Sequence, residues 1–285
     1  SNGTGRPKGQ PLYSRLWGNG FLSSLHQGVQ FRSAKDPVLY LKNPDGVSSQ
    51  ERRKMLDYLA ELNHKQEASF GDPEISSRIA QYEMAYRMQA SVPELMDLSH
   101  EPDSTFELYG EESRQAGTFA ACCLNARRLA ERGVRNIQIF HRGWDAHGGL
   151  PREHENQCKD VDQGCAALIT DLKQRGLLED TLVIWGGEFG RQPTAEYKEG
   201  TGRDHNSYGF TMWMAGGGIK GGVSVGSTDE LGSRAVDDKF HVRRLHATIL
   251  NQLGLDPNNL TFFHGGLDKS LVGVEGAEPI KQIIA

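Results

Sequence analysis

The chain has 285 residues and a net charge of −5, with 32 Lys and Arg against 37 Asp and Glu. The basic residues are scattered, and the cluster Arg52–Lys54 is too short for a basic tract, so no nucleic-acid-binding surface is expected. No run of about 18 apolar residues occurs, which excludes a membrane-spanning helix. The length fits one large α/β domain or two small ones. The first ten residues lack the apolar core of a signal peptide, so they do not predict a location.

The amino-terminal part predicts an irregular segment followed by a helical hairpin. Residues 1–47 are rich in Gly, Ser and Pro, with one expected strand at 37–41. Ser48 or Ser49 is expected to cap a helix that ends near Phe70, and Asp72 a second helix that ends near Gln89. Apolar residues at helical spacing predict the buried face of the first helix: Met55, Leu56, Leu59 and Leu62.

Residues 48–285 predict a single α/β domain that contains this hairpin at about 48–90. Further helices are expected at 118–132, 151–176 and 242–253, and strands at 137–140, 181–185, 210–215 and 223–225. Two strands joined by a helix form a right-handed crossover, so the first two strands are expected to be parallel. The predicted fold is therefore a mostly parallel central sheet flanked by helices. The cysteines show neither disulfide nor zinc spacing and are interpreted as ordinary helix thiols: Cys122, Cys123, Cys158 and Cys165.

Polar residues follow the expected strands at what would be one edge of the sheet. Asp145 and His147 lie in a glycine-rich loop after the first strand, and Glu188 follows the second strand. Asp204 and His205 precede the third strand and reach the same edge only if their loop folds back over it. Open α/β sheets bind ligands at this edge, so these five side chains are candidates to converge. The alternative is that Asp145 caps the following helix and His147 is a solvated loop residue.

Converging carboxylates and imidazoles are typical of a catalytic metal site for hydrolysis, because divalent ions prefer oxygen and nitrogen ligands. Zinc, calcium, magnesium and manganese all remain candidates. Arg191 and Arg203 flank the acids and are candidates to bind a phosphate or sulfate through two hydrogen bonds each. Equally, they can form salt bridges with Glu188 and Asp204. A nucleotide site rests only on the glycine turn at 216–218, which a tight turn explains as well.

Five motifs in order carry a resemblance to a known family. They are GWDAHGG, LLEDTLVIWGGEFGRQP, GRDHN, MAGGGIKGG and STDELG. Over about residues 12–284 the chain resembles the bacterial sulfatase-like family of unknown function numbered fifteen-oh-one, within the alkaline phosphatase superfamily. The resemblance implies an alkaline phosphatase-like α/β fold, and exported or periplasmic bacterial proteins that commonly carry the name sulfatase. It implies hydrolysis of sulfate or phosphate esters of small molecules or carbohydrates.

The superfamily pattern also implies roles for single residues. Asp145 and His147 match the first element of a metal site, Glu188 the second and His205 the third. Glu188 stands where Asp is usual, and Phe189 takes the place of a His or Asn ligand. Because a phenyl ring cannot bind a metal, a two-metal site of the phosphatase kind is not expected.

The nucleophile of the superfamily is a Ser, Thr or formylglycine that follows the first strand. No Cys-x-Pro-x-Arg signature for formylglycine occurs, and Ser23 and Ser24 are the earliest candidates. The chain is therefore expected to match the carboxyl two thirds of such a protein, to be incomplete at the amino end and to lack the nucleophile. Two readings follow: a metal-dependent ester hydrolase, and a catalytically silent domain that holds an acidic or carbohydrate ligand. A missing strand also predicts self-association or coverage of the sheet edge by residues 12–42.

Overall fold

The computed structural model describes residues 4–5, 17–20, 22, 24–32, 37–38 and 41–285. The chain forms two compact units. The first unit contains Ser1–Gly143 and Gln157–Leu168, and the second contains Trp144–Asn156 and Ile169–Ala285. Both contain helices and short strands, so the fold is mixed α/β. Within the described ranges, no helix has both the length and the apolar character needed to cross a bilayer.

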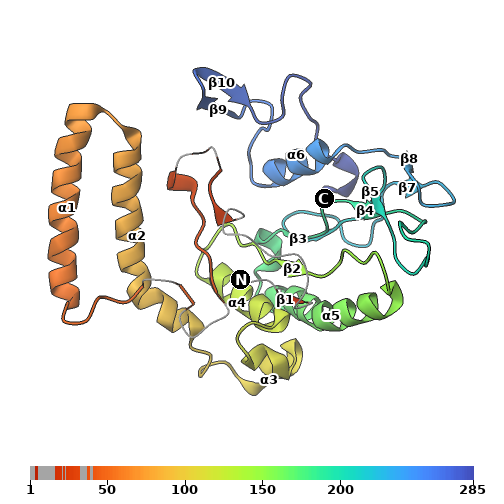
Figure 1. Ribbon diagram of the computed structural model, residues 1–285, viewed down its shortest axis with the longest axis horizontal. Helices are drawn as coiled ribbons and strands as arrows, with labels where there is room; N and C mark the ends of the chain where they lie inside the picture. Colours follow the sequence, from red (N-terminus) through yellow and green to blue (C-terminus); the bar gives the residue numbers. More distant parts are fainter. Residues whose placement is uncertain (1–3, 6–16, 21, 23, 33–36, 39–40) are drawn as a thin grey trace. The chain divides into compact units, whose positions relative to one another are not determined.

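Figure 1 shows the elements in chain order. The α-helices are α1 (Ser49–Phe70), α2 (Pro73–Met96), α3 (Asp103–Tyr109), α4 (Phe119–Glu131), α5 (Leu150–Gln174) and α6 (Val242–Gln252). The strands are β1 (Thr4–Gly5), β2 (His141–Arg142), β3 (Val183–Trp185), β4 (Gly190–Arg191), β5 (His205–Asn206), β6 (Trp213–Ala215), β7 (Ser227–Thr228), β8 (Ala235–Asp237), β9 (Thr261–His264) and β10 (Leu267–Ser270). Short 3-10 turns lie at Ser24–His26, Glu111–Arg114, Leu178–Asp180 and Lys281–Ile283.

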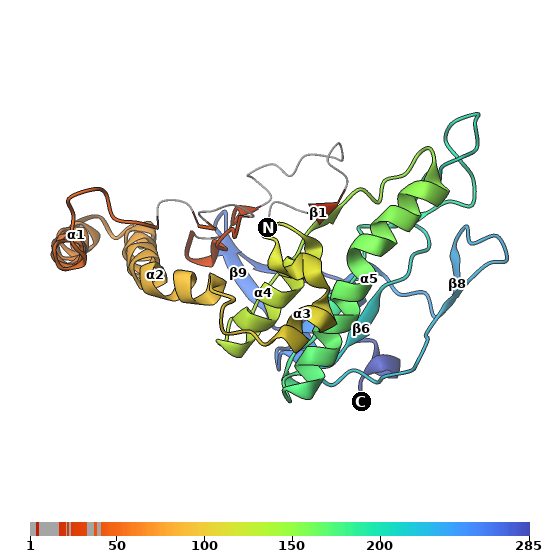
Figure 2. The ribbon, with the colours of Figure 1, turned by 90° about the horizontal axis from the view of Figure 1, so that it is seen from below.

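The predicted helical hairpin is present as α1 and α2, which lie side by side in both views (Figures 1 and 2). Ser48 caps α1 in a capping box: its hydroxyl accepts from the Glu51 N–H, and the Glu51 carboxylate accepts from the Ser48 N–H. Asp72 caps α2 as expected, through the N–H of Glu74 at 2.9 Å. However, α2 continues to Met96 rather than ending near Gln89, because Pro93 does not break it.

The predicted buried face of α1 is confirmed at Leu56 but not at the other residues. Leu56 is 3 % exposed, whereas Met55 and Leu62 are 47 and 57 % exposed. The reason is geometric: α2 packs on the side of α1 that carries Leu56, and the sequence periodicity alone does not select that side.

The strands depart from the predicted sheet. The predicted strand at 137–140 is wrong: among the described residues this segment pairs with no strand, and Ile137 is 37 % exposed. The strand found is β2, which begins directly after Phe140. β2 pairs in parallel with β1, whereas β3 pairs antiparallel with β6. β4 with β5, β7 with β8 and β9 with β10 are also antiparallel. A mostly parallel central sheet is therefore not shown.

Other predicted strands are displaced. The strand expected at 223–225 is found as β7, and the strand expected at 37–41 falls partly outside the described residues. The β9–β10 hairpin was not predicted; its turn has positive φ at Gly265 and Gly266. Short strands fix few backbone hydrogen bonds, so their positions depend on partners distant in sequence.

A buried ion network joins helices of the first unit. The carboxylate of Glu101, 6 % exposed, accepts hydrogen bonds from both Arg127 and Arg128. Arg128 also donates to backbone carbonyls at the end of α2, at 2.8 Å to Leu95 and 2.8 Å to Asp97. The network therefore ties α4 to the last turn of α2.

The second unit brings the loops of the candidate site together. β4 and β5 pair so that Arg191 lies opposite His205. The segment after β4 folds back: Leu150 N–H donates to the Thr201 carbonyl at 2.8 Å, and Arg203 N–H donates to the Ala146 carbonyl at 3.0 Å. The loop before β5 therefore reaches the loop of Asp145, as the prediction required. The four cysteines lie in helices, as expected: Cys122 and Cys123 in α4, and Cys158 and Cys165 in α5.

Candidate metal centre

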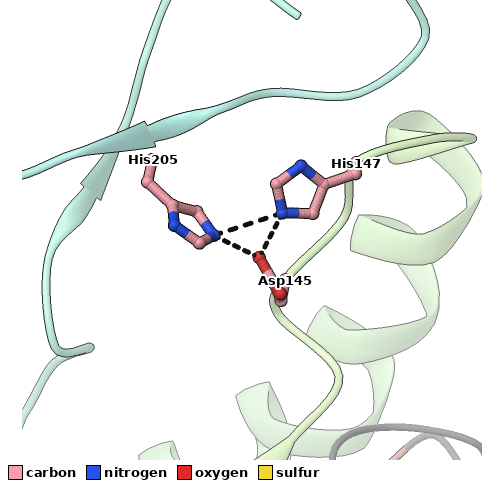
Figure 3. A group of neighbouring side chains, drawn as sticks. All are labelled: Asp145, His147 and His205. Carbon is pink, nitrogen blue, oxygen red and sulfur yellow. Dashed lines mark hydrogen bonds and ion pairs between the residues drawn. The ribbon is translucent and has the colours of Figure 1, made fainter. Parts of the chain in front are cut away.

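Three side chains, two from the loop before α5 and one from β5, meet at one point in the second unit (Figure 3). Oδ1 of Asp145 lies 2.8 Å from Nε2 of His147 and 2.9 Å from Nε2 of His205. The two imidazole nitrogens are 3.2 Å apart. Asp145 and His205 are separated by 60 positions in the sequence, so the contact is purely tertiary.

A glycine makes this approach possible. Gly202 is buried, and a Cβ at this position would lie 2.0 Å from the carbonyl carbon and oxygen of His147. Any side chain there would push apart the two loops that carry the site. On the other side, the β4–β5 ladder fixes the backbone of His205 against that of Arg191.

The separations of the three atoms match those of ligands around a divalent ion. Tetrahedral zinc with bonds of about 2.0–2.1 Å places neighbouring ligand atoms about 3.3 Å apart. The distances of 2.8, 2.9 and 3.2 Å are at or slightly below that value. Two imidazoles with one carboxylate also form a common protein ligand set for catalytic zinc. The residues present therefore fit a divalent metal.

The second nitrogen of His147 faces another acid. Nδ1 lies 2.6 Å from Oε2 of Glu196, close enough for an ion pair. The angles of this contact are not those of a hydrogen bond, and Nδ1 forms no hydrogen bond with any of the described residues. A small rotation of the ring would align an Nδ1–H with this carboxylate and leave the lone pair of Nε2 directed at Asp145. Metal-binding histidines commonly have such a carboxylate partner.

Arg191 supplies positive charge to the same carboxylate. Its Nη1 lies 2.6 Å from Oδ1 of Asp145, and its Nη2 lies 3.5 Å from Oε1 of Glu188. Partial burial raises the pKa of Asp145, but hydrogen bonds from His205 and Arg191 outweigh it and hold that pKa below its usual value. Asp145 is therefore the anionic centre of the cluster.

The predicted site residues divide into two groups. Asp145, His147 and His205 converge as predicted, and Asp204 lies near His147 and Glu196 in a second group of ligand atoms within 4.8 Å of one another. Glu188, 69 % exposed, is in neither group of the described residues and pairs with Arg191.

The two arginines also differ. Arg191 forms salt bridges, one of the two alternatives left open for it. Arg203 donates to the Gly202 carbonyl at 2.7 Å. The ring of Phe189 packs against His205 with centroids 4.5 Å apart, so it closes one side of that imidazole.

Sequence reasoning missed Glu196. It lies in an exposed loop that also contains Lys198 and Glu199, and no spacing distinguishes it from them. Ser24, an early candidate for the nucleophile, is in the first unit, where its hydroxyl donates to Glu74 at 2.6 Å. Ser23 lies outside the described residues.

The model of a family described as "Protein of unknown function (DUF1501)" matches residues 3–284. The chain belongs to the DUF1501 family. No curated protein and no solved structure matches it. Family membership confirms the resemblance that the five motifs carried at the level of DUF1501, and this family has no assigned activity.

Proposed function

We propose that the chain is a metal-dependent hydrolase of sulfate or phosphate esters, with Asp145, His147 and His205 as the metal ligands. The proposal rests on one observation: Oδ1 of Asp145 and the Nε2 atoms of His147 and His205 all lie within 3.2 Å of one another. With both Nε2 atoms deprotonated, the three groups are electron-pair donors that face one point, and a divalent cation held there would relieve their mutual repulsion. A divalent ion held there supplies Lewis-acid chemistry for ester hydrolysis.

The protein's own residues around this point suit an anionic ester. Arg191 is a quarter exposed and lies at the rim of the cluster, where its guanidinium can bind a sulfate or phosphate oxygen. If a divalent ion were bound to Asp145, Arg191 would be free to exchange its contact with Asp145 for one with the anion. Glu196 orients His147. Arg203, whose guanidinium contacts the Gly202 carbonyl, is proposed as the second anion ligand.

The order of the five motifs supports the wider assignment. We infer an alkaline phosphatase-like relationship, a small-molecule or carbohydrate ester as substrate, and an exported or periplasmic location. Zinc has the best-fitting distances; calcium, magnesium and manganese are the other candidates. The mostly parallel sheet of that superfamily belongs to the same proposal.

The experiment measures metal first and hydrolysis second. Purified protein is loaded with each of the four ions, dialysed and analysed for bound metal, together with Asp145→Ala and His205→Ala. His100→Ala, an exposed histidine of the first unit, is the matched control. Stoichiometric metal that only the site variants lose supports the metal centre. Cleavage of p-nitrophenyl sulfate or phosphate by the loaded parent, lost in the same variants, supports the hydrolase.

A specific observation favours a second function, that of a silent binding domain. Oδ1 of Asp145 already receives Arg191 and two imidazoles, and Phe189 covers His205. These groups can neutralise Asp145 without a metal, and they would leave the arginines to hold an acidic or carbohydrate ligand. Two results together would favour this function: the parent protein binds none of the four ions, and it still binds sulfate or a glycan when a chelator is present.

A further inference from the structure

The β4–β5 ladder brings three side chains of the candidate site to one side. Arg191 lies directly opposite His205 in this ladder. Phe189 comes just before β4, two residues from Arg191, and side chains two positions apart along a strand point to the same side. On the other side, a Cβ at Gly190 would lie 2.2 Å from the carbonyl oxygen of Gly209. A larger residue therefore does not fit at Gly190, and the two side chains that flank it turn toward the site.

The ring of Phe189 contacts both of these neighbours. Its centroid lies 4.5 Å from that of the His205 imidazole, with an angle of 39° between the two planes. The guanidinium carbon of Arg191 lies 5.4 Å from the same centroid, which is within the range of a cation–π interaction. One phenyl ring therefore contacts a candidate metal ligand and a candidate anion ligand at once.

The contact with the ring differs in kind from the other contacts of Arg191. Asp145 and Glu188 hold the guanidinium through its N–H groups, which an anionic ligand would also need. The π face of Phe189 attracts the positive charge without an oxygen acceptor, so it does not compete with a phosphate or sulfate for those donors. A guanidinium that is already restricted loses less rotamer freedom when an anion binds.

We propose that Phe189 is a positioning residue that keeps the guanidinium of Arg191 at the site for the anionic group of the substrate. This inference rests on the proposed function, because that function assigns the anion to Arg191. If a divalent ion took over Asp145, the guanidinium would lose that partner, and the ring would still hold it beside His205. The role depends on the π electrons of the ring and not only on its volume.

Titration calorimetry with inorganic phosphate and with sulfate, on the zinc-loaded protein, tests the proposal. Phe189→Leu keeps an apolar side chain but removes the ring, and we expect it to raise the phosphate dissociation constant about threefold. Replacement of Phe189 by 3,4,5-trifluorophenylalanine keeps the ring's shape but weakens its π face, and a similar rise is expected. Phe263→Leu is the matched control and should equal the parent. Phe263 is 73 % exposed, and its strand β9 lies apart from β4 within the same unit (Figure 1).

A double-mutant cycle shows whether the ring acts through the arginine. In an Arg191→Ala background, Phe189→Leu is expected to have no further effect on phosphate affinity. Circular dichroism checks the fold of each variant, and the fluorinated protein retains the test if Phe189→Leu does not fold. The proposal is overturned by a parent that binds no phosphate, by a fluorinated variant that equals the parent, or by an equal effect of Phe189→Leu with and without Arg191.

Zinc content distinguishes this inference from the proposed function. It is measured for every protein, and the phosphate titrations are repeated in a chelator. A parent that holds no zinc counts against the metal-dependent hydrolase, whereas the role of Phe189 is then judged from the same comparison of phosphate affinities in the chelator.

Discussion

The contact between Glu196 and His147 makes a quantitative prediction about metal affinity. Glu196→Gln keeps the size of the side chain but removes the negative charge that lies 2.6 Å from Nδ1. Loss of such an outer carboxylate commonly lowers metal affinity 10- to 100-fold, because the imidazole becomes a weaker and less oriented ligand. Glu196 is 47 % exposed, so water screens part of its charge. The expected loss is about tenfold, or about 1.4 kcal/mol.

Competition with a chromophoric chelator measures this loss directly. Zinc dissociation constants are determined for the parent, Glu196→Gln and Glu199→Gln, the last an exposed acid of the same loop that belongs to neither ligand group of the described residues. We expect Glu199→Gln to match the parent. Equal affinity in all three proteins would refute the role of Glu196, whereas equal loss in both variants would show only a general effect of loop charge.

Further predictions concern stability and loop packing. Glu101→Gln leaves two buried guanidinium groups without their shared carboxylate and is expected to cost about 3 kcal/mol, measured by urea denaturation with hydrogen exchange of α4. Burial raises the pKa of Glu101, but hydrogen bonds from the two arginines lower it by more, so the pKa is below the ordinary carboxyl value of 4.5. The stability that the ionised Glu101 contributes is therefore present above pH 4.5 and is lost as the pH falls through the lowered pKa. Acid melts of the parent should show this loss, and melts of Glu101→Gln should show less of it. Gly202→Ala is expected to abolish metal binding, since its Cβ would meet the His147 carbonyl, whereas Gly221→Ala, with open space around it, should bind as the parent does.

The helices and their ends were predictable because the interactions that fix them are local. The capping residues Ser48 and Asp72 act within three residues of themselves, and both were predicted from the sequence. Two residues of the candidate site, Asp145 and His147, were also predictable from local sequence, since they are only two residues apart. The sequence also contained His205, but only as a candidate whose loop would have to fold back.

Tertiary structure decided the rest. Strand pairing depends on partners distant in the chain, so β3 pairs antiparallel with β6 although a parallel neighbour was expected. The buried side of α1 depends on where α2 packs, which periodicity does not specify. Glu196 reaches His147 because the loop before β5 folds back so that its Gly202 packs against the backbone of His147. Local chemistry therefore determined the helices and supplied most of the candidate site residues, whereas contacts over about 50–60 positions determined which of those residues meet.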